Sequence, residues 1–578
     1  MALPPGPKFL VQSLVSLSTP IVITYASLKV LQHFKIFDFA SWGGVFLVVI
    51  LQPVIVLFKH VFEYFKLRRQ AAERGAIIVP AVQQSSISII KDVLKSFESG
   101  YVGDAFQHWE EKYGSTYTIN IFSETRMITS EPVHMKALLA TQFNEFEKGP
   151  LLFSQWKSLL GTVGYGFLPG EMFHRNMTRP FFNKDRIRDF EIFDSHAIDT
   201  IGQMKKRLAE GHPIEFQDAV ARFTLDSATE FLFGKNVRSL DAGLPYPKSS
   251  GIANSASFTN HPSTVFVNAF MKGQELTTRR NRTGTTWPLT EFWGDKVAEQ
   301  RQIVDGFVKP ILADVLAKKA SGEKKASEEE DFFLGHLVNY TEDEQVLLDE
   351  LVNILVASRD TTAALLTFGI YVLTQRPDIA QRLRDEVMKH VGPTSAPSYD
   401  DIKEMKFLRA FLNETLRLYP PVPFDARTSA GPTTIPNPHD STRPLFVPAN
   451  TKVLYSVFLI HRRKDLWGPD ADEFDPDRFI DHRLHKYLAP NPFIFLPFNA
   501  GPRICLGQQF AYNEASFFLV RLLQNFSSFT FASEAQEEDC KPPEHWKHAS
   551  GTQGRDKIVL RTYLTMFVKG GLWVRMAP

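Results

Sequence analysis

Two long apolar stretches lie near the start of the chain, at Phe9 to Leu28 and at Phe39 to Phe58. Each has 20 residues without a charged side chain, enough for a helix that crosses the roughly 30 Å hydrocarbon core of a bilayer. The second is the more apolar, since the first contains Gln12, Pro20 and several Ser and Thr residues. We therefore predict a membrane anchor within residues 1–75, with one or two transmembrane helices. The alternatives are one span with an interfacial helix or a cleaved signal, and two buried core helices, which usually carry a polar face.

A cluster of basic residues follows the second apolar stretch: Lys59, Lys66, Arg68, Arg69 and Arg74. Positive charge next to a transmembrane helix is retained on the cytosolic side of the membrane. The remainder of the chain is therefore predicted to face the cytosol. From about residue 76 its composition is that of an ordinary globular domain.

A long helix with a polar interruption is predicted in the second half of the chain. Thr341 to Glu344 matches a capping box, and a helical pattern then runs without proline as far as Pro377. Inside it lies the segment Ala357 to Thr362, where the hydroxyls of Thr361 and Thr362 compete for backbone carbonyls and can admit water. This segment is either a groove for proton delivery or a solvent-exposed turn of an amphipathic helix.

A candidate buried ion pair follows on another helix. Glu414 and Arg417 are three residues apart among leucines, hence on one helical face. If both point into a core, bidentate pairing must offset their desolvation. Arg478 offers Glu414 a second guanidinium further along the chain. The same spacing is also common in surface pairs.

Composition limits the chemistry that this chain can hold. It has 578 residues and a formal net charge of +1, which gives no global field for binding a nucleic acid. Its only cysteines are Cys505 and Cys540, too few for a Cys₄ zinc site, an iron–sulfur cluster or a disulfide framework. A functional thiol therefore has two possible positions, and for Cys540 we favour a buried hydrophobic role.

Cys505 lies in a glycine-bounded loop whose frame is Phe498, Gly501, Arg503, Cys505 and Gly507. The residues that follow have helical periodicity, so the cysteine is expected at a helix N-terminus. There the helix dipole and free amide groups favour a thiolate. Arg503 adds a positive charge suited to a carboxylate.

These five residues resemble the haem-thiolate signature of the cytochrome P-450 family. The other motifs occur in that family's order and approximate spacing over roughly residues 80 to 578. Ala357 to Thr362 resembles the oxygen-activating helix motif, with Asp360 and Thr361 as its acid–alcohol pair. Glu414, Arg417 and Arg478 resemble the family's structural triad. The similarity is greatest to microsomal-type fungal hydroxylases of alkanes, fatty acids or xenobiotics.

The resemblance implies a mainly α fold with small β-sheets (α+β), as one haem domain over residues 76–578. It implies haem b with Cys505 as axial thiolate, and Phe498 packed near the sulfur. The expected partners of the haem propionates are Arg503, Arg427 and Arg175. Two positions depart from the family pattern: Ser358 replaces a glycine, and Glu171 replaces a tryptophan, which leaves His174 as an alternative to Arg175.

The implied function is a monooxygenase that uses O₂ and acts on hydrophobic substrates drawn from membrane lipid. No dinucleotide motif or flavin module is evident in the sequence, so electrons are expected from NADPH through a separate cytochrome P-450 reductase. The expected location is the endoplasmic reticulum membrane, with the catalytic domain on the cytosolic face and no nucleic-acid partner. The alternatives are a haem-thiolate isomerase or dehydratase that acts on a peroxide without a reductase, and a non-enzymatic haem-binding sensor.

Overall fold

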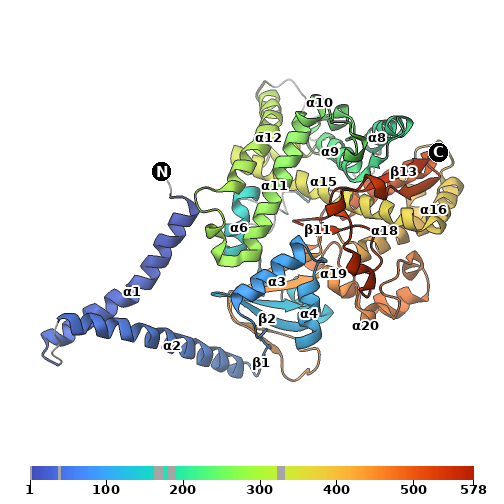
Figure 1. Ribbon diagram of the computed structural model, residues 1–578. Helices are drawn as coiled ribbons and strands as arrows, with labels where there is room; N and C mark the ends of the chain where they lie inside the picture. Colours follow the sequence, from blue (N-terminus) through green and yellow to red (C-terminus); the bar gives the residue numbers. More distant parts are fainter. Residues whose placement is uncertain are drawn as a thin grey trace.

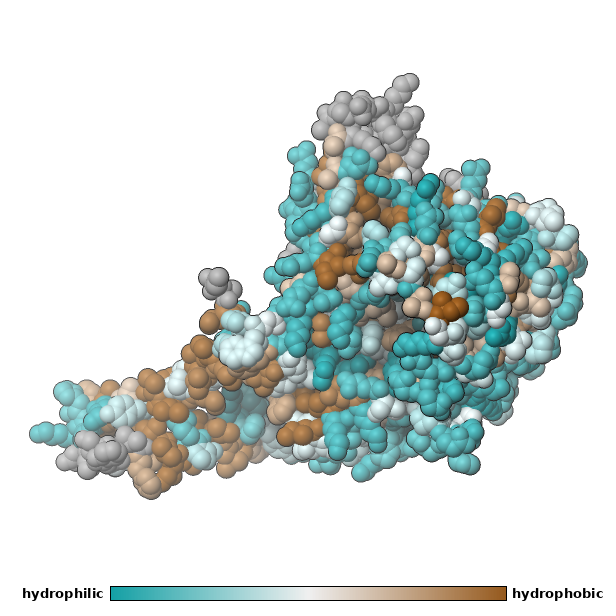
Figure 2. All heavy atoms as spheres, turned by 45° about the horizontal axis from the view of Figure 1, so that its top comes forward, coloured by the Kyte–Doolittle hydropathy of each residue, from teal (hydrophilic) through white to brown (hydrophobic). Residues whose placement is uncertain are grey.

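The two apolar stretches near the N-terminus both form helices that stand apart from the rest of the protein (Figure 1). The structure is a computed structural model that describes residues 3–36, 41–161, 190–321 and 332–578, together with residues 175, 178, 179, 181 and 182. Helix α1 spans Pro5–His33 and α2 spans Ser41–Glu73. Pro5–His33 and Val48–Glu73 are long and apolar enough to cross a membrane. Figure 2 shows that hydrophobic residues cover much of both helices.

The start of α1 touches the body of the protein. Gly6 N donates to Phe292 O at 3.0 Å, and a Cβ at position 6 would lie 2.3 Å from a ring atom of Phe292. This close approach requires glycine. The C-terminal end of α2 leads directly into the body. The start of α1 and the end of α2 therefore both lie at the body (Figure 1).

The body is mainly helical, as predicted. Its α-helices are α3 (Ser86–Glu98), α4 (Asp104–Tyr113), α5 (Pro132–Lys136), α6 (Pro150–Leu160), α8 (Glu191–Ala209), α9 (Phe216–Phe233), α10 (Ala256–Thr259), α11 (Pro262–Thr283), α12 (Lys296–Ser321), α14 (Phe333–Leu337), α15 (Glu344–Gln375), α16 (Pro377–His390), α17 (Tyr399–Glu404), α18 (Lys406–Leu418), α19 (Val457–Ile460), α20 (Lys464–Trp467) and α21 (Gln508–Asn525). Short turns of 3₁₀-helix include η6 (Gly284–Leu289) and η10 (Gly501–Arg503).

Four small sheets complete the described fold, which is therefore α+β. The largest has the order β2 (Thr116–Ile121), β3 (Glu124–Thr129), β9 (Lys452–Ser456), β6 (Phe424–Ser429) and β4 (Phe146–Glu147). The others are β1 (Ile77–Ile78), β8 (Leu445–Val447) and β7 (Thr433–Ile435); β10 (Ser528–Phe531), β13 (Trp573–Ala577) and β5 (Ile214–Glu215); and the hairpin β11 (Leu560–Thr562) and β12 (Met566–Val568). In the largest sheet β3 runs parallel to β9, which pairs Arg126 with Lys452.

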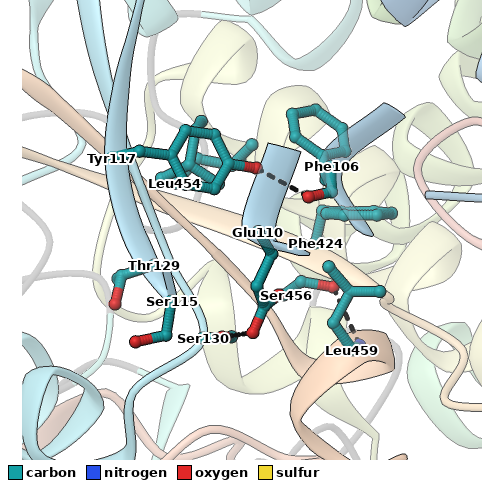
Figure 3. A pocket seen from close by; sticks show the side chains of 11 residues that line it. Phe106, Glu110, Ser115, Tyr117, Thr129, Ser130, Phe424, Leu454, Ser456 and Leu459 are labelled. Atoms are coloured by element: carbon teal, nitrogen blue, oxygen red, sulfur yellow. Dashed lines mark hydrogen bonds between the residues drawn. The ribbon is translucent and has the colours of Figure 1, made fainter. Parts of the chain in front are cut away.

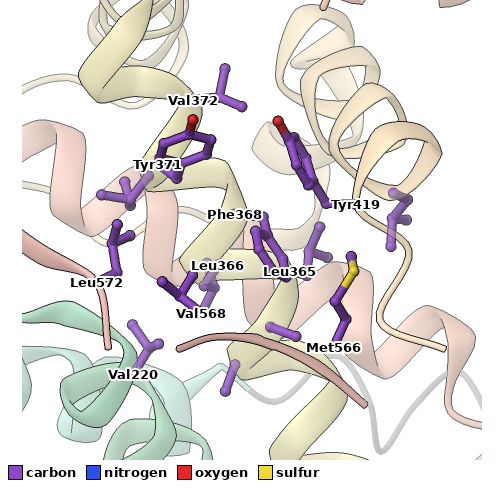
Figure 4. Close-up of a cluster of buried hydrophobic side chains, with 14 of the residues drawn as sticks. Val220, Leu365, Leu366, Phe368, Tyr371, Val372, Tyr419, Met566, Val568 and Leu572 are labelled. Atoms are coloured by element: carbon purple, nitrogen blue, oxygen red, sulfur yellow. The ribbon is translucent and has the colours of Figure 1, made fainter. Parts of the chain in front are cut away.

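Helix α15 forms the centre of the hydrophobic core. It is apolar enough for a membrane span, but 83% of the residues in its most apolar part are buried inside the body. Figure 4 shows Leu365 and Phe368 of α15 among Val220, Tyr419 and Val568, which come from distant parts of the chain. The rings of Phe368 and Tyr419 stack with centroids 5.0 Å apart. The long predicted helix therefore crosses the core.

The capping box predicted at Thr341 to Glu344 is wrong. The helix begins at Glu344, and the carboxylate of Asp343 accepts hydrogen bonds from Gln345 N at 2.9 Å and Val346 N at 3.1 Å. Thr341 Oγ1 instead accepts from Asp343 N at 3.2 Å. A carboxylate caps first-turn amides and interacts favourably with the positive end of the helix dipole, so Asp343 takes the position predicted for the threonine.

Candidate active site

A cavity of about 520 Å³ lies next to α15, and its lining is mostly apolar. Six of the predicted site residues line it: Arg175, Thr361, Phe498, Arg503, Cys505 and Gly507. The other predicted site residues, which are Asp360, Arg427, Gly501 and the triad of Glu414, Arg417 and Arg478, do not line it. His174 and Glu171 lie outside the described residues.

A second cavity, between α4 and the five-stranded sheet, has only about 10 Å³ (Figure 3). That volume holds at most one water molecule. Ser130 Oγ donates to Glu110 Oε1 there at 2.5 Å. No predicted site residue lines this cavity, so the chemistry belongs to the larger one.

The loop that carries Cys505 is shaped by close packing. Gly501 has φ of +62°, and a Cβ there would lie 2.2 Å from Leu139 O, so no other residue fits. Cys505 N donates to Phe498 O at 2.9 Å and closes the loop. The Phe498 ring lies 5.2 Å from the ring of Tyr512 on α21. Helix α21 begins at Gln508, so the cysteine precedes a helix N-terminus as predicted.

The Cys505 side chain is open to the cavity although it lies deep within the protein. Burial raises the pKa of its thiol, while the amide of Gly507 and the charge of Arg175 act in the opposite direction. The amide at the helix terminus thus favours the thiolate, as expected, but burial opposes it. A bound metal ion would deprotonate a coordinating thiol outright.

The predicted propionate partners occupy different surroundings. Arg175 Nη2 donates to Ile504 O at 2.7 Å, and Arg503 lies 4.0 Å from the centre of the Phe143 ring. Both line the cavity. Arg427 is buried in β6, where its Nη1 pairs with Asp425 Oδ2 at 2.9 Å. If Arg427 contributes to cofactor binding, it therefore does so by holding Asp425, which lines the cavity.

Asp425 lines the cavity, and sequence reasoning missed it. Its carboxylate accepts from Lys148 Nζ at 2.8 Å and from Tyr455 OH at 3.0 Å, besides Arg427. Burial would raise its pKa, but the charges of Arg427 and Lys148 hold the pKa well below its ordinary range. Asp425 therefore stays ionised and neutralises Lys148. Two of the partners, Tyr455 and Lys148, lie 30 and 277 residues away in sequence, so no local motif could reveal them.

The polar segment of α15 faces in two directions. Thr361 lines the cavity, and its Oγ1 donates to Ala357 O at 2.6 Å. Ser358 also lines it and donates to Ile354 O at 2.9 Å. The carboxylate of Asp360 is buried behind this wall, paired with Arg359 and with Gln274 Nε2 of α11 at 2.8 Å. A proton relay between Asp360 and Thr361 would require this carboxylate to leave Gln274.

A second buried carboxyl lies next to the same segment. Glu514 of α21 is fully buried, and burial raises its pKa well above the ordinary value, an effect that the Thr362 hydroxyl only partly offsets. We therefore expect a protonated carboxyl. The helical pattern after Cys505 would have placed Glu514 on α21, but not opposite Thr362.

The three residues of the predicted triad come together in the core. Arg417 donates to both carboxylate oxygens of Glu414, at 2.7 and 2.8 Å, and both side chains have no exposed surface. Arg478 Nε lies 3.6 Å from Glu414 Oε1. Asp475 N also donates to Glu414, at 2.9 Å. The buried charges are thus paired and bonded, as the spacing predicted.

His461 joins this triad to the cysteine loop, and sequence reasoning missed it. Leu496 N donates to His461 Nε2 at 3.0 Å, so Nδ1 carries the proton and donates to Arg417 O at 3.0 Å. Burial, with the charge of Arg417, lowers the pKa of His461 to about 3. The neutral ring therefore holds the loop segment at Leu496 that leads to Phe498.

We expect His461 to contribute to acid sensitivity. The unfolded chain binds a proton below a pKa of about 6.5, whereas the folded protein does not until about pH 3. Stability therefore falls as the pH falls between these values, by up to about 1.4 kcal/mol per pH unit. Urea unfolding of the wild type and of His461→Gln between pH 7 and pH 4 measures this. If the free energy of unfolding depends on pH equally in the two proteins, the low pKa of His461 is contradicted.

The donor set of the cavity fits a haem. In the described part of the chain no group of three or more His, Cys, Asp or Glu side chains could hold a metal ion. Cys505 therefore offers a single ligand, which suits an iron whose remaining ligands come from a macrocycle. The guanidinium groups of Arg175 and Arg503 line the same cavity and suit two carboxylates.

Comparisons with known proteins agree with this geometry. A model of the cytochrome P-450 family matches residues 84–553. Cytochrome P-450 52A9 of Candida maltosa is 34% identical over 498 residues, 82% of this chain and 91% of the relative. Cytochrome P-450 52A12 of Debaryomyces hansenii is 32% identical over 522 residues, 88% and 95% respectively. The cytochrome P-450 monooxygenase pvhE of Talaromyces variabilis is 33% identical over 447 residues, 73% and 78%.

The fold and the cysteine-bearing cavity define a haem-thiolate oxidoreductase. The chain belongs to the cytochrome P-450 family and resembles its fungal monooxygenases. Its activity is that of a monooxygenase, and haem iron is its cofactor. The family prediction made from Phe498 to Gly507 is therefore confirmed.

Proposed function

We propose that the protein inserts one oxygen atom of O₂ into long-chain alkanes, fatty acids or aromatic xenobiotics. Electrons come from NADPH through a separate reductase, at the cytosolic face of the endoplasmic reticulum. The observation that carries the proposal is the cavity of about 520 Å³ that is lined by Cys505, by Thr361 and by mostly apolar side chains. Such a lining excludes water from the substrate and favours hydrocarbon groups.

When bound, haem supplies the reductive activation of dioxygen. Cys505 Sγ would hold the iron, while Arg175 and Arg503 would hold the propionates and so fix the orientation of the ring. Phe498 shields the sulfur side of the loop, which tunes a thiolate ligand through its exposure. On α15, Thr361 must release Ala357 O before its hydroxyl can donate a proton into the cavity. The bond to Ala357 O is therefore the point at which proton delivery is controlled.

The two N-terminal helices support delivery of substrate from a membrane. Their side chains are largely apolar and exposed, as a bilayer requires. Since the start of α1 and the end of α2 both lie at the body, the geometry supports two spans with the N-terminus on the same side as the catalytic domain. The basic residues from Lys59 to Arg74 then lie on that side, which the positive-inside rule makes cytosolic.

Oxygen uptake tests the proposal against its main alternative. We expect consumption of O₂ by the full-length protein in lipid vesicles to require NADPH, a cytochrome P-450 reductase and a hydrophobic substrate together. An isomerase or dehydratase would turn over a lipid peroxide without electrons. Turnover of that kind, without uptake in the complete system, would overturn the proposal.

The role of Thr361 is testable by Thr361→Ala. We expect haem to bind normally and the product formed per NADPH to fall by about tenfold or more, with peroxide released, because proton delivery in a positioned site contributes factors of about 10² or more. Thr367→Ala is the matched control, since Thr367 Oγ1 makes the same bond to Ala363 O at 2.7 Å but does not line the cavity. Unchanged coupling in Thr361→Ala would argue against proton delivery by this hydroxyl.

A further inference from the structure

Arg282 is a partly buried guanidinium in the lining of the otherwise mostly apolar cavity. It lies in the last turn of α11, where α3 and the β11–β12 hairpin come close to that helix (Figure 1). Its Nη2 donates to Thr562 O at 2.7 Å, and its guanidinium carbon lies 4.2 Å from the centre of the Phe97 ring. Within the described residues it makes no other hydrogen bond and no ion pair.

The other cations of the cavity have an anionic partner, present or assigned, whereas Arg282 has none among the described residues. Five cationic side chains and one carboxylate line it: Arg126, Lys148, Arg175, Arg282, Arg503 and Asp425. Arg126 is bound by Glu124 through two hydrogen bonds, at 2.7 and 2.9 Å, and Lys148 by Asp425. Arg175 and Arg503 are assigned to the two propionates of the haem. In the part of the chain that the structure describes, Arg282 therefore remains a positive charge without an ion-paired carboxylate.

This imbalance is energetically costly. Burial lowers the pKa of Arg282 to about 10, and the exposed carboxylate of Glu98 offsets that only in part. At neutral pH the guanidinium is still charged. The dipole of α11 and the Phe97 ring stabilise it modestly, but a desolvated guanidinium is satisfied fully by a bidentate anion.

Asn281 supplies a second donor at the same place. Its Oδ1 accepts from Lys452 Nζ at 2.8 Å, and its backbone oxygen accepts from Arg126 Nη2 at 2.8 Å. Both bonds use acceptors, so the Nδ2 group keeps its two hydrogens for another partner. Asn281 lines the cavity next to Arg282.

We propose that Arg282 and Asn281 form a carboxylate-binding subsite, which selects long-chain fatty acids among the hydrophobic substrates. Arg282 binds the two oxygens of the acid head group, Asn281 Nδ2 donates to one of them, and the hydrocarbon tail occupies the apolar remainder of the cavity. The inference rests on the proposed function and specifies its substrate class.

The position of the subsite agrees with entry from a membrane. Two residues after Arg282 the chain enters η6, and it then reaches Phe292, where α1 docks. Leu289 and Trp293 on this segment are 46% and 79% exposed. A fatty acid that enters tail first from the side of α1 would therefore keep its head group near α11 and η6.

Equilibrium binding tests the subsite without turnover. Full-length haem-loaded protein is titrated with a saturated fatty acid, its methyl ester and the n-alkane of equal carbon number, and binding is followed by the haem absorption band. We expect the acid to bind at least about tenfold more tightly than the ester, since hydrogen bonds to charged groups contribute about 1.5–3 kcal/mol. The preference should decrease as the pH falls through the pKa of the fatty acid. Equal binding of acid and ester by the wild type would overturn the proposal.

Variants locate the preference. Arg282→Met should abolish it and Arg282→Lys should retain part of it, because a lysine keeps the charge but not the bidentate geometry. Arg279→Met is the matched control, an exposed arginine one turn earlier on α11 that does not line the cavity, and it should leave the preference intact. A preference that survives Arg282→Met would overturn the assignment. If Arg282→Met loses its haem, the preference for the acid over the ester is compared between Arg282→Lys and the wild type. An undiminished preference in Arg282→Lys, or none in the wild type, would then overturn the proposal. Failure of the proposed function would appear separately, as a lack of NADPH-dependent product from the wild-type protein.

Discussion

Replacing Cys505 with alanine is expected to abolish the red-shifted Soret band of the reduced carbon monoxide complex. That band reports a thiolate on the iron, and in the described cavity Cys505 is the only cysteine. Product formation should fall below detection, because the electron donation that promotes O–O cleavage is lost. The measurement is a reduced carbon monoxide difference spectrum of the membrane-bound variant.

Cys540→Ala is the natural control for this experiment. Cys540 is buried and remote from the cavity lining, and burial raises the pKa of its thiol. The variant should keep the full spectrum, with at most a small loss of stability. A red-shifted band in Cys505→Ala, or its loss in Cys540→Ala, would contradict the assignment of the ligand.

Glu414→Gln is expected to cause the largest loss of stability, about 3–5 kcal/mol, because it leaves the buried Arg417 guanidinium without its counter-charge. Arg478 loses one of its two carboxylates and keeps Asp470, at 3.0 Å. Arg417 and Arg478 have at most about 1% exposed side-chain surface and cannot recover solvation. Since Arg417 O also holds His461, the cysteine loop should lose order and haem affinity should fall. Urea unfolding with haem content as a second readout measures both effects.

The pair Arg382–Asp477 serves as a control for Glu414→Gln. It has the same chemistry, at 2.7 Å, but both side chains are more than a third exposed. Asp477→Asn should therefore cost less than about 1 kcal/mol. A similar small cost for Glu414→Gln would show that the triad is not an essential structural element.

Motifs of short span were predictable because local spacing determines their geometry. The glycines around Cys505 predict a tight loop. Only a glycine indeed fits at position 501, where Leu139 O approaches the backbone. The spacing of Glu414 and Arg417 predicts one helical face, and the pair is bidentate. The two apolar runs predict helices long enough to span a bilayer, and α1 and α2 are such helices.

Contacts between distant segments were not predictable in the same way. Asp360 was expected to act with Thr361 as an acid–alcohol pair, and its carboxylate is bound by Gln274, which lies 86 residues earlier in the chain. Arg427 was expected at the cofactor, but it pairs with Asp425 on the same strand, and Asp425 in turn binds Lys148, 277 residues earlier in the chain. The hydrogen bonds from Leu496 to His461 and from Arg282 to Thr562 join residues 35 and 280 positions apart. Periodicity gives the face of a helix or strand, but the partner on that face depends on tertiary packing.

The direct test of the account is the origin of the oxygen atom in the product. Full-length protein, reductase, NADPH and a fatty acid are incubated under isotopically labelled dioxygen, and the product is analysed by mass spectrometry. We expect a hydroxylated product with one labelled oxygen atom, formed only when both NADPH and reductase are present. An unlabelled product, or one formed from a lipid peroxide without NADPH and reductase, would contradict this expectation.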